Sequence, residues 1–224
     1  MSATSAPSRP VVEALVRTSL FRQLGKPAPA SAAPTLLVNS SARHMHISPA
    51  NLEVLFGPGA KLTVHKWLYQ EGQFASEQTV TLIGPRRRVI PSLRILGPCR
   101  DLTQIELAIT DAIQLGVDLP VKMSGDIKGT PGGYVMGPKG MLEMEEGLIR
   151  AARHVHMSPA DATFYGVKHL DRITLKVTSP ACKTRFDDLI VRVDPSFKLE
   201  VHMDTDEANA CDLERATKVE LFKT

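Results

Sequence analysis

The stretch Arg43-His44-Met45-His46-Ile47-Ser48-Pro49-Ala50 occurs a second time in the chain, as Arg153-His154-Val155-His156-Met157-Ser158-Pro159-Ala160. Every residue shared by the two copies is displaced by the same 110 positions. A repeat of this length, with paired histidines both times, predicts two related halves. We therefore expect the fold to be organised around these two segments.

The spacing of the paired histidines predicts strands that bind a metal. On a helix, residues i and i+2 point in nearly opposite directions, whereas on a strand they share one face, about 6.6 Å apart. Two imidazoles so placed can bind one divalent ion at roughly 2.0–2.1 Å per Zn–N bond. Ser48-Pro49 and Ser158-Pro159 match an N-cap followed by proline at the first helical position, so each strand is predicted to lead into a short helix. The alternative is two half-buried strands whose histidines bond to the backbone, but two copies in one repeated frame favour metal.

The composition is that of an ordinary globular protein. The chain has 224 residues, of which 43% are hydrophobic and 23% charged, and this suits one large or two small domains with packed cores. A net charge of +3 does not favour a nucleic-acid partner, and no apolar run approaches the roughly 18 residues of a membrane span. The three cysteines lack CxxC spacing, which indicates neither a disulfide framework nor a thiolate zinc site. No secretory signal is recognisable, so a reducing cytoplasm fits best.

The first 35 residues are expected to lie outside the core. Val11–Leu24 has the spacing of a short amphipathic helix, and it is followed by a Pro/Ala-rich linker at Gly25–Pro34. A helix of this length on a tether is not stable alone, so we expect it to dock on a partner. A frayed terminus is the alternative.

The remainder of the chain is predicted to be mainly β with short helices. Apolar residues recur with period two, as in Ile173/Leu175/Val177, between Gly- and Pro-containing turns. One longer helix is expected over Asp101–Leu115, where Leu102, Ile105, Ile109 and Ile113 form an apolar stripe that ends before Gly116. Two small β-barrels related by the repeat are the predicted architecture.

Three further features bear on a site. His202 is opposite in phase to Val201 and Met203, so its ring lies on the non-core side of a strand, free to ligate or simply exposed. On the predicted helix Glu106 falls on the apolar face, where a carboxylate needs a metal, a lysine or an exit to solvent. Five arginines within fifteen residues suit either a solvated loop or a polyanionic ligand: Arg86, Arg87, Arg88, Arg94 and Arg100.

At these residues the chain resembles the PduL-type phosphotransacylases, or phosphate propanoyltransferases, of bacterial microcompartments. The shared motifs are SSARHMH, RILGPCR, SGDIKGTPG, RHVHMSPADA and HMDTDEANA, in the family's order from about Leu36 to the C-terminus. The resemblance implies a pair of β-barrels, with the first strand crossed into the barrel built by the C-terminal half. After an N-terminal extension at residues 1–35, the domains would be residues 36–47 plus 154–224, and residues 48–153.

The resemblance also implies a reaction and its site. The enzyme would convert acyl-CoA, with a propanoyl or similar short chain, and phosphate to acyl phosphate and CoA, reversibly and by direct transfer. Two zinc ions, or other divalent metals, would be held by His44, His46 and Glu106, and by His154, His156 and His202. Arg100 would be the catalytic residue and phosphate ligand. The positions implied to lie near coenzyme A are Ser40, Ser41, Ala42, Arg87, Arg94 and Asn209.

Partners and location follow from the same resemblance. The N-terminal helix and linker resemble encapsulation peptides, which implies that residues 11–24 bind a microcompartment shell protein and that the enzyme lies in the microcompartment lumen, within the cytoplasm. A homo-oligomer is expected, with no nucleic-acid or membrane partner. Two rival functions would use the same ligands: a zinc hydrolase of thioesters or phosphoesters, and a non-catalytic metal-binding or shell-docking protein.

Overall fold

The computed structural model describes Val16 and residues 33–223. Pro34–Thr224 form one compact unit. The helix expected at Val11–Leu24 lies outside the described residues except for Val16, which is helical and exposed. None of the described helices is long and apolar enough to cross a membrane.

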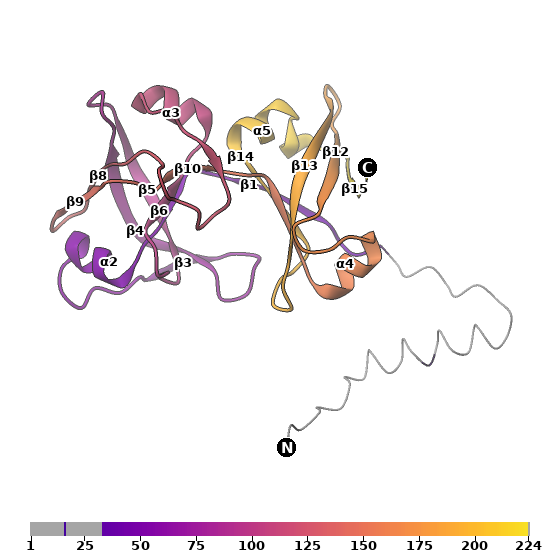
Figure 1. Ribbon diagram of the computed structural model, residues 1–224, viewed down its shortest axis with the longest axis horizontal. Coiled ribbons are helices and arrows are strands. Elements are labelled where there is room, and N and C mark those ends of the chain that lie inside the picture. Colours follow the sequence, from indigo (N-terminus) through magenta and orange to yellow (C-terminus); the bar gives the residue numbers. More distant parts are fainter. Residues whose placement is uncertain (1–15, 17–32, 224) are drawn as a thin grey trace, which may run out of the picture. The chain divides into compact units, whose positions relative to one another are not determined.

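The unit Pro34–Thr224 is built from two curled sheets, each a half-barrel (Figure 1). The six-stranded sheet has the order β1-β14-β11-β13-β12-β15, with β1 (Leu37–Ser41), β11 (His154–Met157), β12 (Arg172–Thr178), β13 (Lys183–Val193), β14 (Glu200–Asp204) and β15 (Lys218–Phe222). The nine-stranded sheet has the order β7-β10-β6-β2-β5-β4-β8-β9, with β3 paired to β4, and consists of β2 (His44–His46), β3 (Val64–Trp67), β4 (Phe74–Ile83), β5 (Val89–Gly97), β6 (Gln104–Glu106), β7 (Val121–Lys122), β8 (Gly133–Met136), β9 (Met141–Met144) and β10 (Leu148–Ala151).

The helices with described bounds are all short. They are α2 (Pro49–Phe56), α3 (Ile109–Leu115), α4 (Pro159–Tyr165), α5 (Thr205–Ala210) and the 3-10 helix η1 (Leu213–Arg215). The prediction of a mainly β fold with short helices is therefore confirmed.

The two histidine strands occupy equivalent places in the two sheets. β2 lies between β5, to which it is parallel, and β6, to which it is antiparallel. β11 likewise lies between the parallel β13 and the antiparallel β14. Each is followed by a helix that begins at proline, where Ser48 and Ser158 accept hydrogen bonds from the backbone N–H groups of Asn51 and Asp161. The predicted strand, N-cap and helix are confirmed in both copies.

The chain passes from one sheet to the other directly after its first described strand. β1 pairs in parallel with β14, with Asn39 opposite His202 and Ser41 opposite Asp204. His44 already pairs with β5 and β6 of the nine-stranded sheet. Figure 1 shows β1 beside β14 before the chain crosses over. The first histidine pair therefore begins just after the crossing.

Each sheet encloses its own apolar core, and this fixes where the histidines point. Met45, between His44 and His46, is fully buried in the first core. Val155, between His154 and His156, is fully buried in the second. Because successive side chains of a strand point to opposite faces, the histidine rings are turned away from both cores.

The helix predicted over Asp101–Leu115 is wrong in its first half. Gln104–Glu106 form strand β6, which pairs with β2 and β10, and the helix begins only at Ile109. The predicted stripe is not a buried face, because Leu102 is 48% exposed and Ile113 68% exposed. Strand partners on both sides satisfy the backbone of β6, and this tertiary pairing overrides the local helical pattern.

Candidate active site

Hydrogen bonds to the backbone determine the tautomer of the first histidine of each pair. The Nδ1 of His44 lies 2.8 Å from the carbonyl oxygen of Ala42, and the Nδ1 of His154 lies 2.9 Å from that of Ala152. A carbonyl oxygen only accepts, so Nδ1 donates in both rings and Nε2 carries the unshared pair. This is the usual arrangement behind an imidazole that ligates a metal through Nε2.

The first ligand cluster consists of His44, His46 and Glu106. The Nε2 atoms of the two histidines lie 3.1 Å apart, and Glu106 oxygens lie 3.5 Å from His44 Nε2 and 3.7 Å from His46 Nε2. Glu106 reaches this place because β6 sets it directly opposite His44. The Nδ1 of His46 is buried and has no hydrogen-bond partner among the described residues. Two imidazoles and one carboxylate are a donor set that suits zinc or another divalent metal.

The second ligand cluster consists of His154, His156 and His202, whose ligand atoms all lie within 4.8 Å of one another. β14 sets His202 directly opposite His154. Both ring nitrogens of His156 are buried without a hydrogen-bond partner in the part of the chain that the structure describes. A buried imidazole with two unsatisfied nitrogens is costly, and ligation of a cation would satisfy one of them. The residues present therefore fit a metal at this cluster also.

The protonation states of three of the histidines and of Glu106 suit metal binding. Burial, aided by the neighbouring imidazoles, lowers the pKa of His46 and of His156 to about 2. Burial likewise lowers the pKa of His154 to about 4. Burial opposes the ionisation of Glu106, but the positive charge that the adjacent histidines carry when protonated, together with the hydrogen bond from Ser124, lowers the pKa of that carboxyl to about 2. At neutral pH these rings are neutral and Glu106 is ionised, which is the state that ligation requires.

A hydrogen-bonded network orients Glu106. The side-chain amide of Gln104 donates to Glu106 Oε1 at 2.7 Å and to Ser124 Oγ at 2.6 Å, and Ser124 donates to the same Oε1 at 3.0 Å. The amide oxygen of Gln104 accepts the backbone N–H of Gly125 at 2.8 Å. Gly125 has φ +99°, a backbone conformation that favours glycine. The orientation of the carboxylate therefore depends on the SGD turn.

A second carboxylate, that of Glu200, lies beside the second cluster and is also held by a glutamine. Its carboxylate is almost fully buried, and its Oε2 lies 3.1 Å from His202 Nε2 and accepts from Gln70 at 2.7 Å. Gln70 lies in the loop between β3 and β4 and also contacts the backbone of Lys198. A loop of the nine-stranded sheet thus holds a carboxylate of the six-stranded sheet in place.

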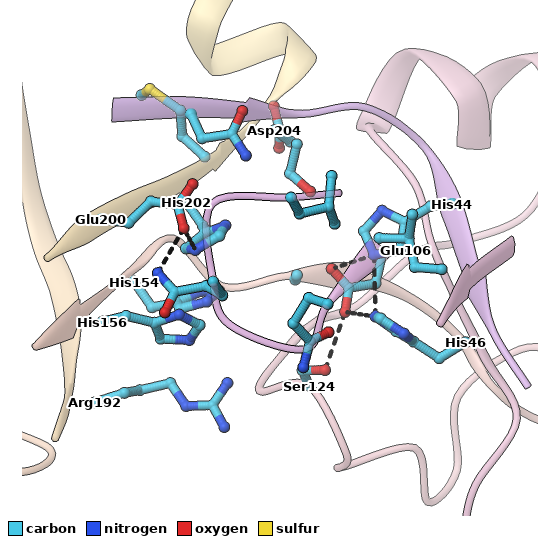
Figure 2. A pocket seen from close by; sticks show the side chains of 18 of the residues that line it. His44, His46, Glu106, Ser124, His154, His156, Arg192, Glu200, His202 and Asp204 are labelled. Carbon is cyan, nitrogen blue, oxygen red and sulfur yellow. Dashed lines mark hydrogen bonds and ion pairs between the residues drawn. The ribbon is translucent and has the colours of Figure 1, made fainter. Parts of the chain in front are cut away.

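Both clusters line one cavity of about 310 Å³ between the sheets. Figure 2 shows His44, His46 and Glu106 on one side of it and His154, His156 and His202 on the other. Two guanidiniums also reach the cavity, those of Arg100 and Arg192. The remaining lining comes from both sheets and includes Asn39, Ser41, Leu68, Gln70, Gln73, Leu96, Leu107, Ser124, Ala151, Ala152, Phe197, Glu200, Met203 and Asp204.

The two guanidiniums are held loosely. Arg100 donates to Ser124 Oγ at 3.4 Å, and the guanidinium of Arg192 lies 5.9 Å from the centre of the Phe197 ring. Neither forms an ion pair with a carboxylate of the described residues. Desolvation lowers the pKa of both groups, while the charge of Glu106 opposes that shift. The cavity therefore offers two cations without a protein anion to match them.

Of the residues predicted for the site, eight line the cavity: Ser41, His44, His46, Arg100, Glu106, His154, His156 and His202. The others lie nearby or at the surface. The carbonyl oxygen of Ala42 accepts the hydrogen bond from His44 Nδ1. Ser40 precedes Ser41 on β1. The guanidinium of Arg94 donates to the carbonyl oxygens of Ser76 and Glu77. Arg87 is exposed in the turn between β4 and β5, and Asn209 is exposed on α5.

The sequence reasoning missed five side chains that shape this cavity: Gln70, Gln104, Ser124, Arg192 and Glu200. For Arg192 a signal was available, because Leu189, Val191 and Val193 alternate along the strand and leave Arg192 on the opposite face. The same alternation sets His202 apart from Val201 and Met203. No comparable pattern marks Gln70, which lies in a loop.

Comparison with known proteins gives a consistent result. A family model described as phosphate propanoyltransferase matches residues 37–214. The phosphate propanoyltransferase of Planctopirus limnophila is 54% identical over 224 aligned residues, which cover 96% of this chain and 92% of the relative. That of Thermotoga maritima is 50% identical over 177 residues, covering 79% of this chain and 84% of the relative. That of Salmonella typhimurium is 45% identical over 170 residues, covering 76% and 80%.

Proposed function

Because the chain belongs to the phosphate propanoyltransferase family, we propose that it converts a short-chain acyl-CoA, such as propanoyl-CoA, and inorganic phosphate to acyl phosphate and CoA, reversibly. One observation supports this most directly. Two complete ligand sets and two unpaired guanidiniums line a single cavity. Such a cavity can hold a thioester and a phosphate side by side.

The proposed cofactors are two zinc ions, or other divalent metals. One would be held by His44, His46 and Glu106, and the other by the three histidines His154, His156 and His202. The metals would supply Lewis acidity, the first toward the thioester sulfur and the second toward phosphate.

Arg100 is proposed to bind phosphate and direct it at the acyl carbon. Its guanidinium can grip two phosphate oxygens and offset their charge, leaving a third oxygen to attack. A bond forms between that oxygen and the acyl carbon while the C–S bond breaks, and the proton of hydrogen phosphate ends on the CoA thiol. The reverse reaction passes through the same arrangement.

Direct transfer is favoured over an acyl-enzyme because the cavity lacks an activated nucleophile among its described lining residues. Among the lining hydroxyls, Ser124 donates to a carboxylate, that of Glu106, at 3.0 Å. A carboxyl with a pKa of about 2 is a very weak base, so it does not deprotonate a serine at neutral pH.

Coenzyme A is proposed to enter along β1 and the nearby surface. Ser41 lines the cavity, and the neighbouring Ser40 and Ala42 extend that edge. Arg87 and Arg94 would contact the coenzyme's phosphates, and Asn209 on α5 would contact its distal part. These assignments come from the family resemblance.

The two sheets are proposed to be two β-barrel domains related by duplication, residues 36–47 plus 154–224 and residues 48–153. The equivalent neighbours of β2 and β11, and the pairing of β1 with β14, support duplication and an exchanged first strand. Within this division β2 is the segment that joins the domains, because it pairs in the nine-stranded sheet.

Encapsulation in a bacterial microcompartment is proposed for the N-terminal segment, with residues 11–24 binding a shell protein. The match to the Planctopirus limnophila protein covers 96% of this chain, so it necessarily extends into the first 35 residues. A homo-oligomer is proposed on the family resemblance alone.

One assay tests the proposed activity. Free thiol release from propanoyl-CoA is followed with and without phosphate, alongside zinc analysis of the protein. We expect release that depends on phosphate and yields propanoyl phosphate. Equal release without phosphate, with propanoate as product, would instead identify a thioester hydrolase, and a zinc protein with neither reaction would identify a binding protein.

A further inference from the structure

The two halves of the cavity differ at one pair of equivalent positions. In the parallel pairing of β11 with β13, His154 lies opposite Ile190 and His156 opposite Arg192. In the parallel pairing of β2 with β5, His44 lies opposite Arg94 and Met45 opposite Ile95. The residue that corresponds to Arg192 is therefore Leu96, two positions after Arg94. Both Leu96 and Arg192 line the cavity, so a leucine in one half stands where the other half has an arginine.

The ligand clusters differ in charge too, and again the half with His154 and His156 is the more positive one. Across the antiparallel neighbour, His44 faces Glu106 whereas His154 faces His202. The first cluster therefore contains an ionised carboxylate, and the second contains only imidazoles. Glu200 lies beside the second cluster, 3.1 Å from His202, but it is not one of the three ligands and already accepts from Gln70. With a divalent cation in each ligand set, the all-imidazole set would keep one more unit of positive charge than the set with Glu106, and this favours a multiply charged anion beside the second cluster.

Arg192 is free to bind an external anion. The carboxylates that line the cavity already have partners: Glu106 has His44 and His46, Glu200 has Gln70, and Asp204 has Arg150. Two other partly buried arginines, Arg150 and Arg153, are paired, since each lies 3.0 Å from Glu207. Arg192 has no such pair among the described residues. A desolvated guanidinium without an anion is costly, and a bound anion would offset that cost.

One weak contact, with the ring of Phe197, orients the guanidinium of Arg192 before any ligand binds. The ring of Phe197 stacks on His156, with centroids 4.0 Å apart and an angle of 21° between planes, and Arg192 lies over the same ring. Figure 2 shows the Arg192 side chain reaching into the pocket from the wall that carries His156. An arginine oriented on an aromatic face loses less freedom on binding than a solvated one.

We propose that Arg192 is a second phosphate-binding residue, which together with Arg100 clamps inorganic phosphate, and the phosphate of the acyl phosphate product, at the His154/His156/His202 end of the cavity. Leu96, at the matching position of the other half, adds no positive charge at the opposite end, where the acyl thioester would lie. This inference rests on the proposed function and deepens it. Arg100 comes from the nine-stranded half and Arg192 from the six-stranded sheet, so the clamp requires both halves.

The test is a kinetic and binding comparison of Arg192→Ala, Arg192→Lys and a control, Arg185→Ala. Arg185 lies on the same strand but is exposed and paired with Asp187. We expect Arg192→Ala to raise the KM for phosphate roughly 10- to 100-fold, as for the loss of charge-assisted hydrogen bonds, and to leave the KM for propanoyl-CoA almost unchanged. Arg192→Lys keeps the positive charge but loses the bidentate geometry of the guanidinium, so its KM for phosphate should lie between those of the wild type and Arg192→Ala. Equilibrium dialysis of the zinc-loaded protein against radiolabelled phosphate should show the same order of affinities, with unchanged zinc content.

Two failures are distinguishable. If wild-type protein releases thiol at the same rate without phosphate, the proposed function is wrong and the clamp with it. If the wild type is active but Arg192→Ala and Arg185→Ala bind phosphate equally, or share the wild-type KM for phosphate, only the role of Arg192 is overturned. Because Arg192→Lys preserves the charge and most of the side-chain volume, it allows the comparison even where the alanine variant folds poorly.

Discussion

The Nε2 atoms of His44 and His46 lie 3.1 Å apart, and a Glu106 oxygen lies within 3.7 Å of each. Because Nδ1 of His44 donates to Ala42, an unshared pair of the His44 ring points at these neighbours. A divalent cation would be stabilised by all three groups at once.

Glu106→Gln should lower the zinc content from about two ions per chain to about one, because the amide keeps the shape of the side chain but not its charge. Phosphate-dependent thiol release should be lost with the ion. Elemental analysis after dialysis measures the stoichiometry. Glu143→Gln is the matched control, since Glu143 is exposed and only accepts from Tyr134. Two retained ions in Glu106→Gln would contradict the assignment of this cluster.

Arg100→Ala should raise the KM for phosphate roughly 10- to 100-fold, or abolish turnover, while both zinc ions stay bound. The reason is that Arg100 contacts Ser124 but neither ligand cluster directly. Initial rates at varied phosphate give the effect. Arg88→Ala, which changes an exposed turn residue, serves as the control. An Arg100→Ala enzyme with normal phosphate kinetics would remove Arg100 from the phosphate site.

Acid should destabilise the metal-free protein. Burial lowers the pKa of His154 to about 4 and of His156 to about 2, whereas both titrate near 6.5 when the chain is unfolded. Above that value both states are neutral, and the contribution to stability is complete. As the pH falls below about 6.5 the unfolded chain takes up protons that the folded rings do not, so the free energy of unfolding decreases.

Urea unfolding of chelator-treated protein at about pH 7.5 and about pH 5 measures this effect as a lower midpoint in acid. His156→Gln should weaken the dependence on pH, because it removes one buried ring. His65→Gln, at an exposed position, should retain it. A midpoint that does not change between the two conditions would be incompatible with neutral buried rings.

Arg150→Ala should lower the free energy of unfolding by about 3 kcal/mol, because it leaves buried carboxylates without their cation. Arg150 on β10 donates to Asp204 on β14 and lies 3.0 Å from Glu207 on α5, so it joins the two sheets. Urea unfolding again provides the measurement. The exposed pair removed by Arg185→Ala should contribute no more than about 1 kcal/mol, and equal effects of the two substitutions would argue against a cross-sheet role for Arg150.

A fusion of residues 1–35 to a fluorescent reporter should gather in microcompartments of shell-producing cells, because the apolar stripe of residues 11–24 needs a partner surface. Fluorescence microscopy reports the location. Leu20→Asp, which places a charge on the stripe, should make the signal diffuse. A diffuse signal from the unaltered fusion would count against encapsulation.

Sequence reasoning recovered what depends on local spacing. The two histidine strands, the Ser-Pro helix starts and the period-two strands follow from neighbours in the chain, and all are present. For Glu106 the expectation of a largely buried carboxylate is met, but the predicted helix face that led to it is wrong. Glu106 is placed by β6 opposite His44 and not by a helix face.

The sequence by itself determined that the paired histidines lie on two strands with the same flanking residues. The reason is that alternation along a strand depends only on adjacent residues. Only the tertiary structure decided which sheet contains β1 and that Gln104–Glu106 form a strand and not a helix. It also decided that Arg100 and Arg192 line one cavity. Those outcomes depend on hydrogen bonds and packing between segments far apart in the chain. The free energy of these long-range interactions cannot be inferred from the residue pattern of any one segment.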